Sequence, residues 1–288
     1  MSRKFIGLAV VLILTLACGL SNPATPGQTG VETIVAATFE ALTAGAPTQP
    51  SGNPVSFEYV SFTIPGGLAA GANGETLPVV TEETGDPWSV APEHVRFTFN
   101  GYSTTGSFSN MSLTVYPAQE YADAYAGAET SLQKLQAILA SPSAPLEFNS
   151  LPQVPSFNAA QMVAAQVQRL NFTNGSGVRM VTQYGQAVGP ITNRGTFYHY
   201  QGLTNDGKFL VVVVLPIGSP LLVTGDNENE PIPVGGVEFP GYDSLDPADF
   251  ESYFLAVTDI LNAASPDTFQ PSLTLLDSLI QSISIGAP

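Results

Sequence analysis

The stretch 209–215 constrains the fold of this chain more than any other part of the sequence. It reads Phe-Leu-Val-Val-Val-Val-Leu, so every side chain in it is apolar. Because successive side chains of a β-strand point to opposite faces of a sheet, such a strand is apolar on both faces. The stretch therefore predicts a central strand with a covering layer on each side. The turn Asn205-Asp206-Gly207 precedes it and predicts a hairpin with residues 196–203.

Apolar residues alternate with polar ones in two other segments, which is typical of strands with one buried face. These segments are residues 95–100 and 111–115. Their polar members are Arg96, Thr98, Asn100, Ser112 and Thr114. Residues 166–172 and 178–186 flank a glycine-rich turn and predict a second hairpin. Residues 57–64 predict one further strand, with its alternation slipping near Val60.

Three stretches carry apolar residues at the three- and four-residue spacing of a helix. The first covers residues 121–139, the second begins at Pro247 with Asp246 as its N-cap, and the third begins near Pro271. The order of these elements predicts an α+β fold. We expect a mainly antiparallel sheet with helices on both faces, which is an α/β/α sandwich.

This order of elements resembles the Mog1/PsbP-like family of folds. The resemblance rests on residues 57–65, on the strand-to-helix join 113–117 and on the hairpin 197–215, and it covers most of residues 55–288. An insertion around residues 224–242 is not part of the usual pattern of that family. The resemblance implies a non-enzymatic accessory or binding module, because such folds commonly help to assemble or stabilise larger complexes.

The N-terminus has the features of a signal peptide. Arg3 and Lys4 precede the apolar run 5–14, which is too short to span a bilayer comfortably. The run leads into Leu14-Thr15-Leu16-Ala17-Cys18-Gly19, which resembles the lipobox of bacterial lipoproteins except at Thr15, where that family usually has an aliphatic residue. The resemblance implies removal of residues 1–17 and attachment of lipid to Cys18. The alternative is a free cysteine in an ordinary signal peptide or anchor helix.

Composition divides the rest of the chain into two parts. Residues 18–54 are rich in proline and glycine, which is typical of a flexible tether. Apolar residues at helical spacing within 31–42 predict a short, marginal helix in this tether. Residues 55–288 are long enough for one sizeable core and predict a single α+β globular domain. We expect the protein at the cell envelope, anchored by lipid to the outer face of a membrane.

Charge and cysteine content exclude several classes of protein. The chain has 24 acidic and 8 basic residues, a net charge of −16, whereas nucleic-acid binders need a basic surface. Its single cysteine excludes an intrachain disulfide and any multi-cysteine metal site. The sequence has no Gly-x-Ser-x-Gly motif, and no glycine-rich phosphate-binding loop follows a strand. We therefore expect no cofactor, no nucleic-acid partner and no enzymatic activity.

Few polar residues are candidates for a functional site. His94 and His199 are the two histidines, and both are expected as strand residues, either exposed or hydrogen-bonded in the core. A metal candidate is the loop with carboxylates at alternate positions, Asp226, Glu228 and Glu230, which offers oxygen ligands for calcium. A solvated acidic loop explains the same residues.

Aromatic residues give one candidate binding face. Tyr198 and Tyr200 share one face of their strand, and Tyr184 lies on a strand that we expect to be a neighbour. An exposed row of such rings would stack on a sugar or a peptide. The alternative is that a helix covers the face, with the helix bearing Tyr121 and Tyr125 as the candidate.

Three functions remain open at this point. The first is a membrane-tethered extracytoplasmic lipoprotein, held by lipid on Cys18, whose non-enzymatic domain binds a protein partner or assists complex assembly. The second is a receptor lipoprotein for a small solute or sugar, which requires a deep pocket with convergent polar groups. The third is an envelope hydrolase with an unrecognised site, which requires perturbed carboxylates in a cleft.

Overall fold

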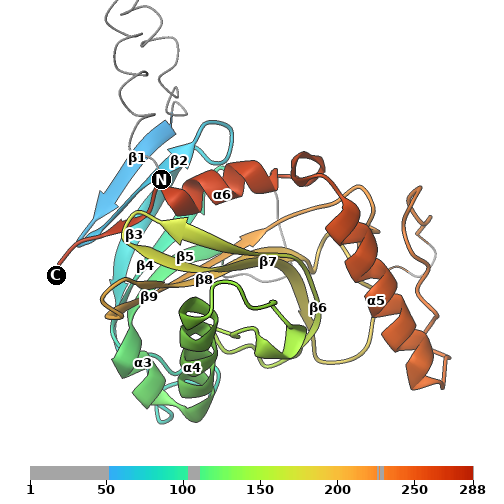
Figure 1. Cartoon of the computed structure of the whole chain (residues 1–288), viewed down its shortest axis with the longest axis horizontal. Helices are drawn as coiled ribbons and strands as arrows, with labels where there is room; N and C mark the ends of the chain where they lie inside the picture. The colour runs from blue at the N-terminus through green and yellow to red at the C-terminus, as the bar shows by residue number, and fades with distance from the viewer. Residues whose placement is uncertain (1–51, 103–110, 226, 228–229, 288) are drawn as a thin grey trace, which may run out of the picture. The chain divides into compact units, whose positions relative to one another are not determined.

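The computed structural model describes residues 52–102, 111–225, 227 and 230–287, and these ranges contain two antiparallel sheets (Figure 1). The strands of the larger sheet are β3 (Gly71–Leu77), β4 (His94–Asn100), β5 (Ser112–Pro117), β6 (Ala160–Phe172), β7 (Gly175–Gly185), β8 (Phe197–Thr204) and β9 (Phe209–Pro216). Their order in space is β3-β4-β5-β9-β8-β7-β6. The predicted hairpins β6–β7 and β8–β9 are both present.

β9 occupies the central position that its sequence predicts. It pairs with β5 on one side and with β8 on the other. Val211, Val213 and Leu215 point into one hydrophobic core. Leu210, Val212 and Val214 point into a second core on the opposite face. The prediction of a strand covered on both faces is confirmed.

Helices cover both faces of the larger sheet, so the fold is α+β with helices on both faces, as predicted. α3 (Ala118–Ala124) and α4 (Ala126–Ala140) pack on one face, and α6 (Leu273–Gln281) lies on the other (Figure 1). α5 (Pro247–Ala263) joins the α6 side through Tyr253, Val257 and Leu261. Two short 3-10 helices complete the described helical elements, η1 (Phe148–Ser150) and η2 (Pro266–Thr268).

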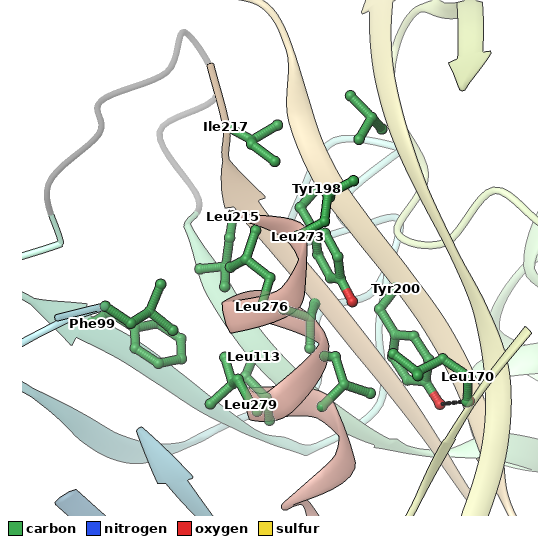
Figure 2. Close-up of a cluster of buried hydrophobic side chains, with 14 of the residues drawn as sticks. Phe99, Leu113, Leu170, Tyr198, Tyr200, Leu215, Ile217, Leu273, Leu276 and Leu279 are labelled. Atoms are coloured by element: carbon green, nitrogen blue, oxygen red, sulfur yellow. Dashed lines mark hydrogen bonds between the residues drawn. The ribbon is translucent and has the colours of Figure 1, made fainter. Parts of the chain in front are cut away.

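The core on the α6 side brings leucines of α6 together with two tyrosines of β8. Figure 2 shows Leu276 and Leu279 of α6 above the sheet residues of this core, among them Leu113. Tyr198 and Tyr200 are fully buried in the same core. The Tyr200 hydroxyl donates a hydrogen bond to the carbonyl oxygen of Leu170 at 3.1 Å (Figure 2). Burial of the two rings therefore leaves the Tyr200 hydroxyl satisfied.

The smaller sheet joins the two ends of the described chain. Its strands are β1 (Gly52–Phe57), β2 (Val60–Pro65) and β10 (Ser284–Ile285), in the order β1-β2-β10. The prediction of a single strand over residues 57–64 is wrong, because the chain turns between β1 and β2 at Glu58, whose φ is +51°. This turn explains the slip in alternation near Val60. β1 begins at Gly52, inside the range 18–54 that the sequence assigns to the tether.

The predicted helix over residues 121–139 is two helices in the structure. Tyr125 separates α3 from α4 with an extended backbone, φ −163° and ψ +153°. Its ring packs edge-on against Tyr121 at 5.9 Å. A Cβ atom at Gly127 would come within 2.5 Å of the Tyr125 ring. The apolar spacing continues across the break because both helices face the same core.

β3 is a strand that the sequence did not predict, because its residues Gly-Ala-Asn-Gly-Glu-Thr-Leu have low strand propensity. It lies at the edge of the larger sheet and pairs with β4. A Cβ at Gly74 would lie 2.5 Å from the Phe57 ring, so glycine allows β1 to cross close to β3. The contact between β1 and β3 thus requires Gly74, and the same glycine weakens the strand pattern in the sequence.

Polar contacts attach α5 and α6 to the sheet. Arg179 of β7 is buried and lies 3.2 Å from the carboxylate of Asp277 on α6, which also accepts a hydrogen bond from the Tyr198 hydroxyl at 2.9 Å. Gln166 of β6 donates from Nε2 to the carbonyls at the C-terminal end of α5, including Leu261 O at 2.8 Å. At the other end, Asp246 accepts from the amide of Ala248 and caps the helix, as predicted.

Candidate functional site

A cavity of about 630 Å³ lies on the α3/α4 face of the larger sheet, within the size range of small-molecule sites. Its floor is formed by three adjacent strands, β4, β5 and β9. The floor residues are Arg96, Ser112, Thr114, Val212 and Val214. Residues 88–91, between β3 and β4, and residues 155–159, between η1 and β6, also line the cavity. The site therefore combines sheet positions with two loops.

The polar part of the floor is built by strand register. Arg96 on β4 lies directly opposite Thr114 on β5, and the Thr114 hydroxyl donates to Ser112 Oγ at 3.3 Å. Ser112 and Thr114 are buried. Strand alternation directs Phe97, Leu113 and their apolar neighbours into the other core. One guanidinium and two hydroxyls thus share the cavity side of β4 and β5.

Among the described residues, Arg96 has one ion-pair partner, Glu75 of β3, which lies opposite it in the β3–β4 register. Arg96 Nε and Nη2 both donate to Glu75 Oε1, at 3.2 and 2.8 Å. About a third of the Arg96 side chain and half of the Glu75 side chain are exposed. Glu75 is not part of the cavity lining, and no aspartate or glutamate occurs among the described residues that line it.

His94 borders the same cavity and stays neutral near pH 7. Its Nδ1 lies 2.7 Å from the carbonyl oxygen of Pro92, which can only accept, so Nδ1 carries the proton of the neutral ring. Burial lowers the pKa of His94, and the charge of nearby Arg96 lowers it further. The ring packs against Tyr116 at 4.6 Å, and Tyr116 stacks on Tyr121 at 4.4 Å.

Aromatic rings form much of the remaining wall. Trp88 is 41% exposed, and Phe157 packs on Tyr184 with 4.3 Å between ring centroids. The Tyr184 hydroxyl is buried and has no hydrogen-bond partner among the residues that the structure describes. Burial raises its pKa, so the hydroxyl stays protonated. The ring of Tyr184, not its buried hydroxyl, is therefore the part that lines the cavity.

The three tyrosines of the predicted binding face do not form one face. Tyr198 and Tyr200 are fully buried beneath α6, while Tyr184 points to the opposite side of the sheet, toward α3 and α4. The expectation of an exposed row over Tyr184, Tyr198 and Tyr200 is therefore wrong. Its physical reason is that α6, from the end of the chain, covers the face that carries Tyr198 and Tyr200. Only Tyr184 lines the cavity.

Both histidines are hydrogen-bonded strand residues, which is one of the two predicted outcomes. His199 is fully buried on the face opposite Tyr198 and Tyr200, and its Nε2 lies 2.6 Å from the Val154 carbonyl oxygen. Its Nδ1 has no hydrogen-bond partner within the described ranges. Phe157 and Phe197 pack around the ring. His199 does not line the cavity, so the structure does not bring the two histidines together there.

Two other predicted sites fall partly or wholly outside the described residues. Cys18 lies outside them, as do Asp226 and Glu228 of the acidic loop. Glu230 is described, and its carboxylate accepts from the backbone amides of Thr224 and Gly225 at 2.6 and 3.1 Å. No cluster of three or more His, Cys, Asp or Glu side chains suited to a metal ion occurs in the described ranges.

Sequence reasoning found Arg96, Ser112 and Thr114 but assigned them to a polar strand face, not to a site. A signal for the cavity was present. Residues 209–215 need cover on both faces, so polar side chains on the neighbouring strands must lie under that cover. Trp88 was missed because nothing in its local sequence indicates that its loop lies against the sheet.

Comparison with known proteins adds no relative: no family model, no curated protein and no solved structure matches this chain. Across the described residues, no helix is both long enough and apolar enough to cross a membrane. The cavity is thus interpreted from its own residues.

Proposed function

We propose that this chain is an extracytoplasmic receptor lipoprotein for a small organic ligand, held at the outer face of a membrane by lipid on Cys18. The observation that carries the proposal is the cavity of about 630 Å³ on the α3/α4 face of the larger sheet. Several aromatic rings line it, among them Trp88, Phe157 and Tyr184, and it has a few polar groups on rigid strands. These are the usual features of small-molecule sites.

The cavity changes the order of the functions that the sequence left open. Protein binding stood first there, and the small-ligand receptor required a pocket with convergent polar groups. Arg96, Ser112 and Thr114 are such groups, so they support the receptor. Hydrolysis by paired carboxylates has no support at this site, because the described lining residues include no aspartate or glutamate.

Trp88 provides the experiment. It is the single tryptophan of the chain, and it lines the cavity. A library of sugars, amino acids and aromatic acids would be titrated into residues 50–288 and into the full chain while Trp88 emission is recorded. A ligand of this site is expected to change the emission in a saturable way and to raise the melting temperature of both proteins.

A matched pair of variants separates this cavity from other surfaces. Val212→Phe places a ring on the cavity floor, so it should abolish the response, whereas Val234→Phe changes a fully exposed residue and should preserve it. Circular dichroism would confirm that both variants are folded. A response that survives in folded Val212→Phe, or a library without any saturable ligand, contradicts the proposal.

A further inference from the structure

We infer that the ligand of this cavity is an organic anion: a flat apolar ring body with one carboxylate or sulfonate group, which the Arg96 guanidinium holds on the polar floor that it shares with Ser112 and Thr114. This inference rests on the proposed function, since it names the chemistry of the ligand for the same cavity. It follows from the charge, the donors and the rings that line the site.

Charge is the first argument. The chain has three times as many acidic as basic residues, yet the described cavity lining includes one arginine and no carboxylate. The pKa of His94 is lowered by burial, so that ring adds no positive charge near pH 7. Arg96 is therefore the single charged group of the described lining. The chain as a whole is acidic, but the one charged side chain in this lining is a cation. The cavity therefore favours an anionic ligand over a cationic one.

The donors of Arg96 are the second argument. Glu75 engages Nε and Nη2 through one oxygen atom, Oε1. A guanidinium has five N–H donors in a planar fork, so donors remain for a second anion. A carboxylate or sulfonate accepts several of these bonds at once, which makes it the best match to that fork.

Register supplies the third argument. Thr114 lies directly opposite Arg96, and Ser112 is 3.3 Å from the Thr114 hydroxyl, so both hydroxyls share the strand face of the guanidinium. These groups lie on the strands and not on the loops, which fixes their positions. A bound anion would accept its hydrogen bonds from the Arg96 guanidinium beside these hydroxyls, because Thr114 already donates its one proton to Ser112.

The rings define the body of the ligand. Trp88, Phe157 and Tyr184 line the cavity, and the valines of β9 form an apolar part of its floor. Flat apolar groups stack on such rings. The site thus fits a molecule with one charged end and one ring system.

Two fluorescent probes test the inference. Anilinonaphthalene sulfonate is an aromatic anion, and N-phenyl-naphthylamine is the same ring system without the sulfonate. Both accept excitation energy from tryptophan, and Trp88 is the single donor in the chain, so energy transfer reports binding near the cavity. In the full chain we expect the anionic probe to bind about tenfold more tightly than the neutral one.

Variants of the ion pair make the test specific. Arg96→Gln should remove the preference for the anion, with about tenfold weaker binding of the sulfonate and unchanged binding of the neutral probe. Glu75→Gln should increase affinity for the sulfonate, because it removes the negative charge that neutralises the Arg96 guanidinium. Arg194→Gln changes an exposed arginine outside the lining and should have no effect. Trp88→Phe should abolish the energy transfer.

The outcomes separate the inference from the proposed function. Equal affinity of the two probes in the unmodified chain, or full sulfonate affinity in folded Arg96→Gln, overturns the anion while leaving a small-ligand receptor. If Arg96→Gln does not fold, Glu75→Gln decides, and unchanged sulfonate affinity in that variant overturns the inference. Failure of both probes to show transfer from Trp88, together with a failed ligand library, contradicts the proposed function itself.

Discussion

His199 makes the stability of this protein depend on pH. It is fully buried, and desolvation lowers its pKa from 6.5 to about 4 in the folded protein. The unfolded chain binds a proton below pH 6.5, whereas the folded chain resists it until about pH 4. The free energy of unfolding should therefore decrease as the pH falls through this window, by about 3 kcal/mol at most from His199. Urea unfolding at several pH values between 7 and 4 measures the decrease.

A glutamine variant isolates the contribution of His199 from other titrating groups. His94 acts in the same direction, since burial lowers its pKa as well. In His199→Gln the amide can still donate to the Val154 carbonyl, but it does not titrate. The variant should lose less stability between pH 6.5 and 4 than the unmodified protein. Parallel stability curves for the two proteins would contradict this assignment.

The ion pair between Arg179 and Asp277 gives a second prediction at the residue scale. The Arg179 side chain is 3% exposed, and the Asp277 carboxylate is its ion-pair partner. Asp277→Asn leaves the buried guanidinium without a counter-charge, so we expect a loss of about 3 kcal/mol in the free energy of unfolding. Tyr198→Phe removes one hydrogen bond to Asp277 and should cost about 1 kcal/mol.

Urea unfolding at pH 7 measures these losses, and Asp259→Asn on the exposed side of α5 is the matched control. The control should change stability by less than about 0.5 kcal/mol. A loss in Asp277→Asn no larger than in the control would mean that solvent or another group neutralises Arg179.

The sequence predicts which face of its strand a residue lies on, but it does not predict which segment of the chain covers that face. Alternation places His199 opposite Tyr198 and Tyr200, and the structure agrees. Alternation contains no information about which distant segment lies above a face. The prediction that Tyr198 and Tyr200 are exposed is wrong for this reason, because α6, which covers them, begins more than seventy residues later.

At the scale of elements, α5 depends on one glutamine of β6. Gln166 lies at a bulge of β6, where its φ is +54°. Its side-chain amide donates hydrogen bonds to the carbonyls of Leu261, Asn262 and Ala264. Gln166→Ala removes these bonds and should destabilise the last turn of α5 by about 1 kcal/mol. Hydrogen exchange should become faster in α5 than in α6.

A glycine variant distinguishes lost bonds from backbone strain. Gln166→Gly also removes the side chain, but glycine accepts a positive φ without cost. If the bonds to α5 matter, both variants should accelerate exchange in α5. Acceleration in Gln166→Ala alone would assign the effect to strain in the bulge and contradict the docking role of Gln166.

Elements were predictable where the pattern is local and strong. The two hairpins, α6 and the capped start of α5 follow from turn residues, proline positions and apolar spacing. The break at Tyr125 was not predicted, because the apolar spacing continues through it. The edge strand β3 was not predicted either, since its glycine at position 74 serves contact with Phe57 and weakens the strand pattern.

At the scale of the whole molecule, the proposed anchor can be tested by one substitution. Cys18→Ala removes the thiol that the proposal assigns to lipid. The protein should move from the membrane fraction to the soluble fraction, because the remaining acidic chain has little attraction for anionic headgroups. Fractionation followed by mass spectrometry of the N-terminal peptide measures both location and lipid. A variant that has lost residues 1–17 and still stays in the membrane fraction would contradict anchoring through Cys18.

The smaller sheet places β2, from the beginning of the described chain, between β1 and β10, from its end. Ser282, next to β10, bonds both the amide and the carbonyl of Thr63, which lies more than two hundred residues earlier. Pairing over such a separation is slow to form. The sheet therefore cannot be completed until residues 284–285 have been synthesised. Before that point β2 of a nascent chain would be paired on one edge alone, and a variant that lacks β10 would lack the closing step of folding.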